Sequence, residues 1–201
     1  MADEALAIDR PLPVGSKGRL SSGWWGMLAV IATEASLFSY LFFSYYYLAA
    51  QVHGAWPPDG PPSLKLSIPG TVLLVLGSMT MAWGEHGIRR GRSGRLIAGI
   101  VATLVVGVVF LGLQLVEWRG RHANAASDLY DSLYFTITGF HMAHVAIGLG
   151  MLAVLGVWTA LGYFGERRHS AVSIGVIYWH FVTAVWFFVF FTFYVMPYLQ
   201  R

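Results

Sequence analysis

One long apolar run with a single acid in its middle limits what this chain can fold into more than any other feature. Residues 24–50 read WWGMLAVIATEASLFSYLFFSYYYLAA, and apart from tyrosines the only ionisable side chain among them is Glu34. At a rise of about 1.5 Å per residue, a helix of this length crosses a hydrocarbon core of roughly 30 Å. We therefore predict a transmembrane helix with Glu34 near the bilayer midplane, where an acid costs about 2.5 kcal/mol or more.

The composition extends this prediction to the whole chain. Of its 201 residues, 56% are hydrophobic and only 11% are charged, whereas soluble domains carry about 25% charged residues. Four more apolar runs of helix length follow, so we predict an all-α integral membrane protein with five transmembrane helices. Its short basic blocks then belong to loops and do not indicate nucleic-acid binding.

The chain has no cysteine, which excludes disulfides, thiolate metal sites and iron–sulfur clusters.

Turn signals and loop charges give the predicted bounds and orientation. We predict a cytoplasmic polar lead-in at 1–21 and a membrane domain at 22–201. The predicted spans are at about 24–50, 66–84, 95–118, 129–164 and 171–199. The fourth run is longer than a perpendicular crossing needs, so we expect it to tilt or to project beyond the membrane. Lysines and arginines divide nine to four between the two faces, which predicts a cytoplasmic N-terminus and an outward C-terminus.

Ionisable side chains recur at one depth on different predicted helices. His141 and His180 lie about as deep as Glu34, and His144 follows His141 by three residues on the same helical face. Polar groups at one depth usually face the bundle interior and pair with one another. We therefore treat these four residues as a candidate functional set.

Four interpretations of this set are open at this point. Glu34 can be a neutral acid that hydrogen-bonds to a neighbouring helix and fixes the packing, with neutral histidines beside it. The histidines can ligate haem or a metal, although His141 and His144 are too close to serve two stacked haems. The set can carry protons in an independent transporter, although no inverted repeat accompanies it. It can also belong to a non-redox subunit of a larger complex, which the glycines of the third and fourth spans favour.

Five segments resemble, in the same order, segments of subunit III of the haem–copper oxidases, typically cytochrome c oxidase. They are TEASLF, GAWPPDG, LQLVEW, GFHMAHVAIG and YWHFVTAVWFFVFFTFY, and together they cover the chain from about residue 24 to residue 194. By this resemblance Glu34 matches the membrane-embedded glutamate of the family, and His141 with His144 matches its paired histidines. His180 with Trp186 matches its terminal tryptophan–histidine motif.

The LQLVEW segment adds Gln114 and Glu117 as supporting polar residues at the outer end of the third span, where an ionisable group is less costly. The segment after the second span reads GEH where the family has a paired histidine, so only His86 carries over. Thr183 stands where an aspartate commonly follows the HFV motif, which argues against an acid role at that position.

The resemblance also implies a function. It implies an accessory subunit that has no catalytic residue, metal ligand, haem or copper of its own, and that packs against catalytic subunit I, beside subunit II. It implies support of proton uptake, protection from turnover-linked inactivation, and bound phospholipid that guides dioxygen inward. The setting it implies is a bacterial plasma membrane, in an aerobic terminal oxidase or a larger respiratory supercomplex. Subunit III of a quinol oxidase is the alternative.

Longer members of this family have two further helices before the one with the glutamate. Here only the polar lead-in precedes that helix. We therefore expect the lipid cleft that those helices close to be altered, or to be supplied by another chain.

Overall fold

The computed structural model describes residues 22–53, 56–58, 60, 62–120, 128–166 and 168–199. Its long helices are α1 (Ser22–Gln51), α2 (Leu64–Ile88), α3 (Ser93–Gly120), α4 (Leu129–Ala160) and α5 (Ser170–Phe190). A π-helical turn (Phe191–Val195) and the short α6 (Met196–Leu199) continue α5. Within these described ranges, five helical segments, the last of them running from Ser170 to Leu199, are long and apolar enough to cross a membrane. The prediction of an all-α bundle with five membrane-spanning helices is confirmed.

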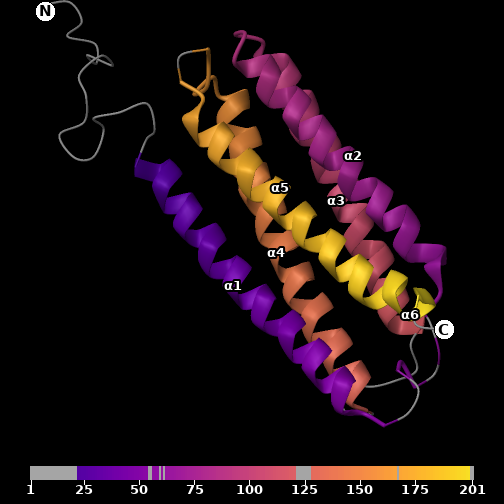
Figure 1. Cartoon of the computed structure of the whole chain (residues 1–201). Helices are drawn as coiled ribbons and strands as arrows, with labels where there is room; N and C mark the ends of the chain where they lie inside the picture. Colours follow the sequence, from indigo (N-terminus) through magenta and orange to yellow (C-terminus); the bar gives the residue numbers. More distant parts are fainter. Residues whose placement is uncertain are drawn as a thin grey trace, which may run out of the picture.

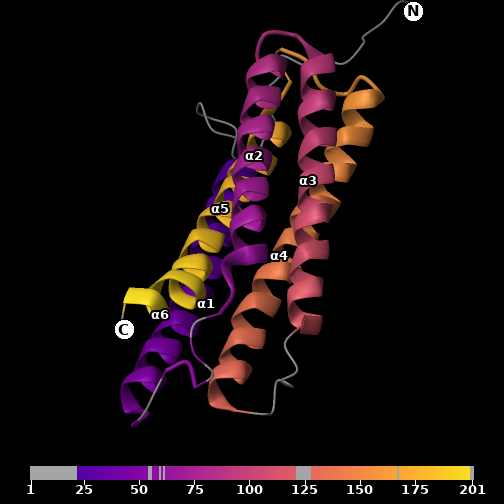
Figure 2. The same ribbon diagram turned by 90° about the vertical axis from the view of Figure 1, so that its right-hand side faces the viewer.

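The long helices alternate in direction, so that successive connections lie at opposite ends of the bundle (Figure 1). The start of α1, the α2–α3 turn and the α4–α5 connection share one end, while α6 lies at the other. Helices α4 and α5 contact each other in the middle, with α1 against one side of them and the α2–α3 hairpin against the other (Figures 1 and 2).

Aromatic side chains fill the interior between α3, α4 and α5. Trp179 and Trp186 of α5 are almost fully buried, and Phe110 of α3 meets Trp186 edge-on with 4.8 Å between the ring centroids. Among the 30 residues of α1, by contrast, only Phe38 and Tyr45 are buried. The core therefore lies within α2 to α5, and α1 is attached at its edge.

Two glycines in the left-handed conformation close the turns at the end shared by the α2–α3 and α4–α5 connections. Gly91, with φ +71°, donates its N–H to the carbonyl of Ile88, and Gly162, with φ +80°, donates its N–H to the carbonyl of Thr159. Both are Schellman motifs, which end a helix where a glycine can take positive φ. The turn at Gly162 ends α4 at Ala160, before the predicted position 164. The turn at Gly91 ends α2 only at Ile88, four residues past its predicted end at 84.

The last predicted span, 171–199, is not one regular helix. After Phe190 the chain widens into the π-helical turn before α6 begins. Pro197 of α6 has no N–H to donate to the carbonyl four residues earlier, and its ring crowds that carbonyl. A wider turn ahead of the proline relieves this conflict.

Candidate functional site

Glu34 and His144 form a hydrogen-bonded pair between α1 and α4. Glu34 Oε2 lies 2.8 Å from His144 Nε2, and His144 is midway along α4. The Glu34 side chain is 29% exposed and that of His144 is 11% exposed. The pair therefore lies at the edge of the bundle, where α1 meets α4, and not in the interior.

The backbone determines which nitrogen of His144 carries a proton. Its Nδ1 lies 2.6 Å from the carbonyl oxygen of Phe140, one turn earlier, and a carbonyl can only accept, so Nδ1–H is the donor. A second proton must lie between His144 Nε2 and Glu34 Oε2, because two acceptors without a proton would repel each other. This proton belongs either to the carboxyl group or to the imidazole. The pair has no net charge in either form, as a site away from water requires.

Aromatic neighbours hold the pair in place. The Phe38 ring meets the His144 ring edge-on, with 5.1 Å between the centroids. Tyr178 of α5 donates its hydroxyl proton to the carbonyl oxygen of His144 over 3.4 Å. Three helices, α1, α4 and α5, thus meet at this point.

His141 does not join the pair, although it lies only three residues away. Its imidazole is fully buried between Phe110 of α3 and Trp186 of α5, with 5.1 Å between the centroids of His141 and Trp186. Within the part of the chain that the structure describes, neither ring nitrogen of His141 has a hydrogen-bond partner. Trp186 donates its Nε1–H to Thr71 Oγ1 of α2 over 2.9 Å, so it does not satisfy His141.

His180 takes part in a separate set of contacts between α5 and α2. Its Nδ1 forms a hydrogen bond with Ser78 Oγ. Nearer the α2–α3 turn, Glu85 Oε1 accepts hydrogen bonds from Ser173 Oγ over 2.6 Å and from Arg89 Nη2 over 2.7 Å. Seven residues separate Ser78 from Glu85, and seven separate Ser173 from His180. The polar contacts therefore recur every two helical turns along the seam between α2 and α5.

Gln114 and Glu117 are linked by two tyrosines. Gln114 Nε2–H donates to the hydroxyl of Tyr134 over 3.2 Å, this hydroxyl bonds to that of Tyr194 over 2.9 Å, and Tyr194 donates to Glu117 Oε1 over 2.7 Å. Sequence reasoning singled out neither tyrosine, and Tyr194 lies in the aromatic run AVWFFVFFTFYV of the last predicted span. The available signal for Tyr194 was a tyrosine in place of a phenylalanine near the end of that run.

The other positions named from the sequence stay apart from these contacts. His86 is exposed near the end of α2, and Thr183 bonds to the carbonyl of Trp179 in its own helix over 3.0 Å. Among the described residues, no three histidine, aspartate or glutamate side chains gather closely enough to hold a metal ion. Of the four residues in the candidate set, the structure brings together only Glu34 and His144.

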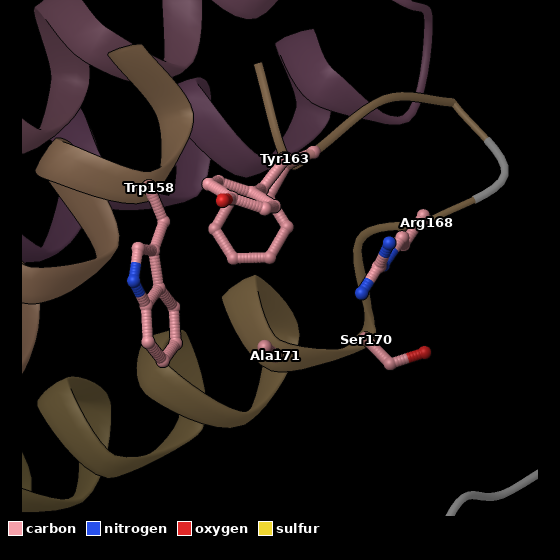
Figure 3. Close-up of a pocket in the computed structure, with 6 residues that line it drawn as sticks. Trp158, Tyr163, Arg168, Ser170 and Ala171 are labelled. Carbon is pink, nitrogen blue, oxygen red and sulfur yellow. The ribbon is translucent and has the colours of Figure 1, made fainter. Parts of the chain in front are cut away.

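A pocket of about 560 Å³ opens where α4 gives way to α5. It is lined by Trp158, Tyr163, Phe164, Arg168, Ser170 and Ala171. Figure 3 shows Trp158 on one side of this pocket and Arg168 on the other. The pocket thus combines aromatic side chains, a cation and a hydroxyl group. It lies at the end of the bundle that also carries the α2–α3 turn.

Comparisons with known proteins give one consistent result. The sequence profile of the family described as "Cytochrome c oxidase subunit III" matches residues 19–198. The chain is 30% identical over 177 residues to "Cytochrome c oxidase subunit 3" of Arabidopsis thaliana, a match that covers 85% of this chain and 67% of the relative. The protein of the same name from Danio rerio is 30% identical over 177 residues, covering 85% and 68%. That of Synechocystis sp. is 30% identical over 186 residues, covering 90% and 79%.

Proposed function

This chain belongs to the cytochrome c oxidase subunit III family, and from that premise we propose that it is an accessory subunit without a redox centre in an aerobic terminal oxidase. Its partners in this proposal are catalytic subunit I and subunit II, which hold the haem and copper. We place the complex in a bacterial plasma membrane, and the five apolar helices support a multi-pass membrane protein. The names of the relatives favour cytochrome c over quinol as the electron donor of the complex.

We propose that the end of the bundle with the α2–α3 turn faces the cytoplasm. Among the described residues, the basic side chains at this end are Arg89, Arg90, Arg92, Arg95 and Arg168. Those near the opposite end are Lys65 and Arg119. Loops rich in lysine and arginine stay on the cytoplasmic side of a membrane, which supports this orientation.

The pairing of Glu34 with His144 is the observation that carries the role we propose for this subunit. Since the pair is uncharged overall in either protonation form, it can lie inside a membrane without a counter-ion. It also joins α1, which has few buried residues of its own, to the core of the bundle. We propose that the pair acts as a fixed link. It holds the bundle in the shape that stabilises the catalytic subunit and thereby supports its proton uptake.

Replacing Glu34 tests this role. In Glu34→Gln the amide N–H can donate to His144 Nε2, so the link is kept while the carboxyl proton is removed. We expect an oxidase with this variant to consume dioxygen at the normal rate and to resist turnover-linked inactivation as the wild type does. In Glu34→Leu the imidazole loses its partner inside the membrane, and we expect faster inactivation during turnover. A Glu34→Gln oxidase that assembles normally but pumps fewer protons per electron would assign proton transfer to Glu34.

We also propose that the pocket between α4 and α5 holds the headgroup of an anionic phospholipid. Arginine binds phosphate oxygens through two parallel N–H donors, and aromatic side chains favour the membrane–water interface. The volume of about 560 Å³ is in the range of ligand sites, roughly 300–1,000 Å³. Acyl chains extending from this pocket along the helices would offer dioxygen an apolar route through the membrane.

The lipid content of the purified oxidase tests this proposal. Arg168→Gln removes the cation from the pocket, and we expect one anionic phospholipid fewer per complex by mass spectrometry. Arg90→Gln is the matched control, because Arg90 is exposed at the same end of the bundle but does not line the pocket. Equal lipid content in the two variants would mean that Arg168 holds no headgroup.

A further inference from the structure

Within the part of the chain that the structure describes, no other element covers the side of α1 that faces away from α4 and α5. Exposed residues recur every three to four positions and so form one continuous strip. We call its central part the outer face of α1, defined by Thr33, Ser36, Ser39, Tyr40, Phe43 and Tyr47. Phe38 and Tyr45 mark the opposite, buried side of the same helix.

Tyr40 places its hydroxyl group on this face, near the middle of a helix long and apolar enough to cross a membrane. It lies 18 residues after Ser22 and 11 before Gln51, so its Cα is roughly 5 Å from the middle of a hydrocarbon core about 30 Å thick. Side chains on a helix lean toward its N-terminus, which turns the phenol ring back toward the midplane and away from the nearer interface. The side chain is 69% exposed, and within the described part of the chain its hydroxyl makes no hydrogen bond.

The neighbouring hydroxyl groups do not satisfy Tyr40. Thr33, Ser36 and Ser39 each donate to a backbone carbonyl of α1 itself, over 2.7, 2.9 and 2.7 Å. Lipid tails offer no hydrogen bond, and a polar group left without one in hydrocarbon is costly. The small side chains beside Tyr40 also leave room for another helix to approach closely.

The exposed face of α3 shows the contrasting chemistry of a surface covered by lipid. Its large exposed residues are Val101, Val105, Val108, Val109, Leu115 and Val116. None of these side chains can form a hydrogen bond. The two faces belong to helices of similar length and direction but differ in polarity.

We propose that the outer face of α1 is an interface with a transmembrane helix of another oxidase subunit, and that this helix supplies a hydrogen-bonding side chain to the Tyr40 hydroxyl. The inference rests on the proposed function, since it needs a second subunit in the membrane. It goes beyond that function by naming the contacting helix and the chemistry of the partner side chain.

Photo-crosslinking in the assembled oxidase tests the interface. The photoreactive residue p-benzoylphenylalanine replaces Tyr40 in one variant and Val109 in a second, because Val109 lies at a similar depth on the exposed face of α3. On irradiation of native membranes, we expect position 40 to link to another oxidase subunit and position 109 to link to lipid alone. Lipid adducts alone at position 40, or equal linking to protein at both positions, would overturn the inference.

Tyr40→Phe tests the hydrogen bond without changing the size of the side chain. We expect it to raise the release of this chain from the oxidase in detergent by about three- to tenfold, the effect of one hydrogen bond between membrane helices. Tyr46→Phe is the control, because the Tyr46 hydroxyl bonds to Thr192 Oγ1 within the chain over 3.0 Å. Unchanged release of Tyr40→Phe would contradict the proposed hydrogen bond.

The failure of the proposed function and the failure of this inference can be told apart. If the wild-type chain does not co-purify with an oxidase, both fail. If the chain co-purifies with an oxidase but position 40 forms only lipid adducts, the inference alone is refuted.

Discussion

His141 and His144 lie three residues apart on α4 but differ in how their ring nitrogens are satisfied. Both nitrogens of His144 have partners, in Phe140 and Glu34. Those of His141 have none among the described residues, and the ring is held by aromatic contacts with Phe110 and Trp186. A buried polar group without a hydrogen bond costs about 1–3 kcal/mol, so the two residues should contribute to stability with opposite sign.

Parallel leucine substitutions test this difference. We expect His144→Leu to lower the free energy of unfolding by about 1–3 kcal/mol, because it leaves Glu34 without a partner in the membrane. We expect His141→Leu to leave stability unchanged or to raise it, because an apolar side chain needs no hydrogen bond in that place. Thermal unfolding of the two variants in one detergent measures both effects. An equal loss in His141→Leu would reveal a hydrogen-bond partner for His141, such as an internal water molecule.

The sequence alone could identify Glu34 and the deep histidines as the residues to examine, because ionisable groups inside an apolar run are rare. It could not identify His144 as the partner of Glu34, since His141 and His180 lie at similar depths. The choice depends on the rotation of α4 and α5 about their axes. Large side chains such as Trp186 determine that rotation only once the bundle is packed.

At the level of elements, α2 and α3 pack so closely that their backbones touch. A Cβ atom added to Gly99 would lie 2.7 Å from the carbonyl oxygen of Thr80 and 3.0 Å from the Cα of Gly84. The Thr103 hydroxyl crosses the same interface to the carbonyl of Gly77 over 3.1 Å. Close backbone approach and interhelical hydrogen bonds are the interactions that hold membrane helices together.

Two alanine substitutions in α3 test this close packing. We expect Gly99→Ala to lower the free energy of unfolding by about 1–3 kcal/mol, because backbone atoms of α2 must move to admit the methyl group. Gly112→Ala is the control, since a Cβ atom at Gly112 has no neighbour within 4 Å and alanine favours the helix. Unfolding in a denaturing detergent measures both variants. Equal stability of the two proteins would show that α2 and α3 can separate without cost.

Hydropathy was sufficient to predict the number of long helices, because a chain in lipid must satisfy its backbone within each helix. The ends of the helices depend on local turn chemistry. Gly91 and Gly162 end α2 and α4 by taking positive φ, and hydropathy does not register this property. The π-helical turn before Pro197 was beyond prediction for a similar reason, because it follows from one missing N–H group and not from polarity.

For the whole molecule, the family could be predicted from five short segments in a fixed order. The surfaces that the chain offers to other molecules needed the fold. Trp158 and Arg168 form one pocket only because the turn after α4 brings them together. The outer face of α1 becomes visible only once the opposite side of that helix is known to pack against α4 and α5. We propose that this subunit acts through such surfaces, while electron transfer takes place in its partners.

The most direct measurement is the visible spectrum and metal content of this chain, purified through a tag in mild detergent and then separated from its partners. We expect the mild preparation to contain the catalytic subunit and to show haem absorption. The separated chain should be colourless and should lack stoichiometric iron and copper. A chain that keeps haem or copper by itself, or that purifies without any oxidase subunit, would contradict its role as a non-redox subunit of a terminal oxidase.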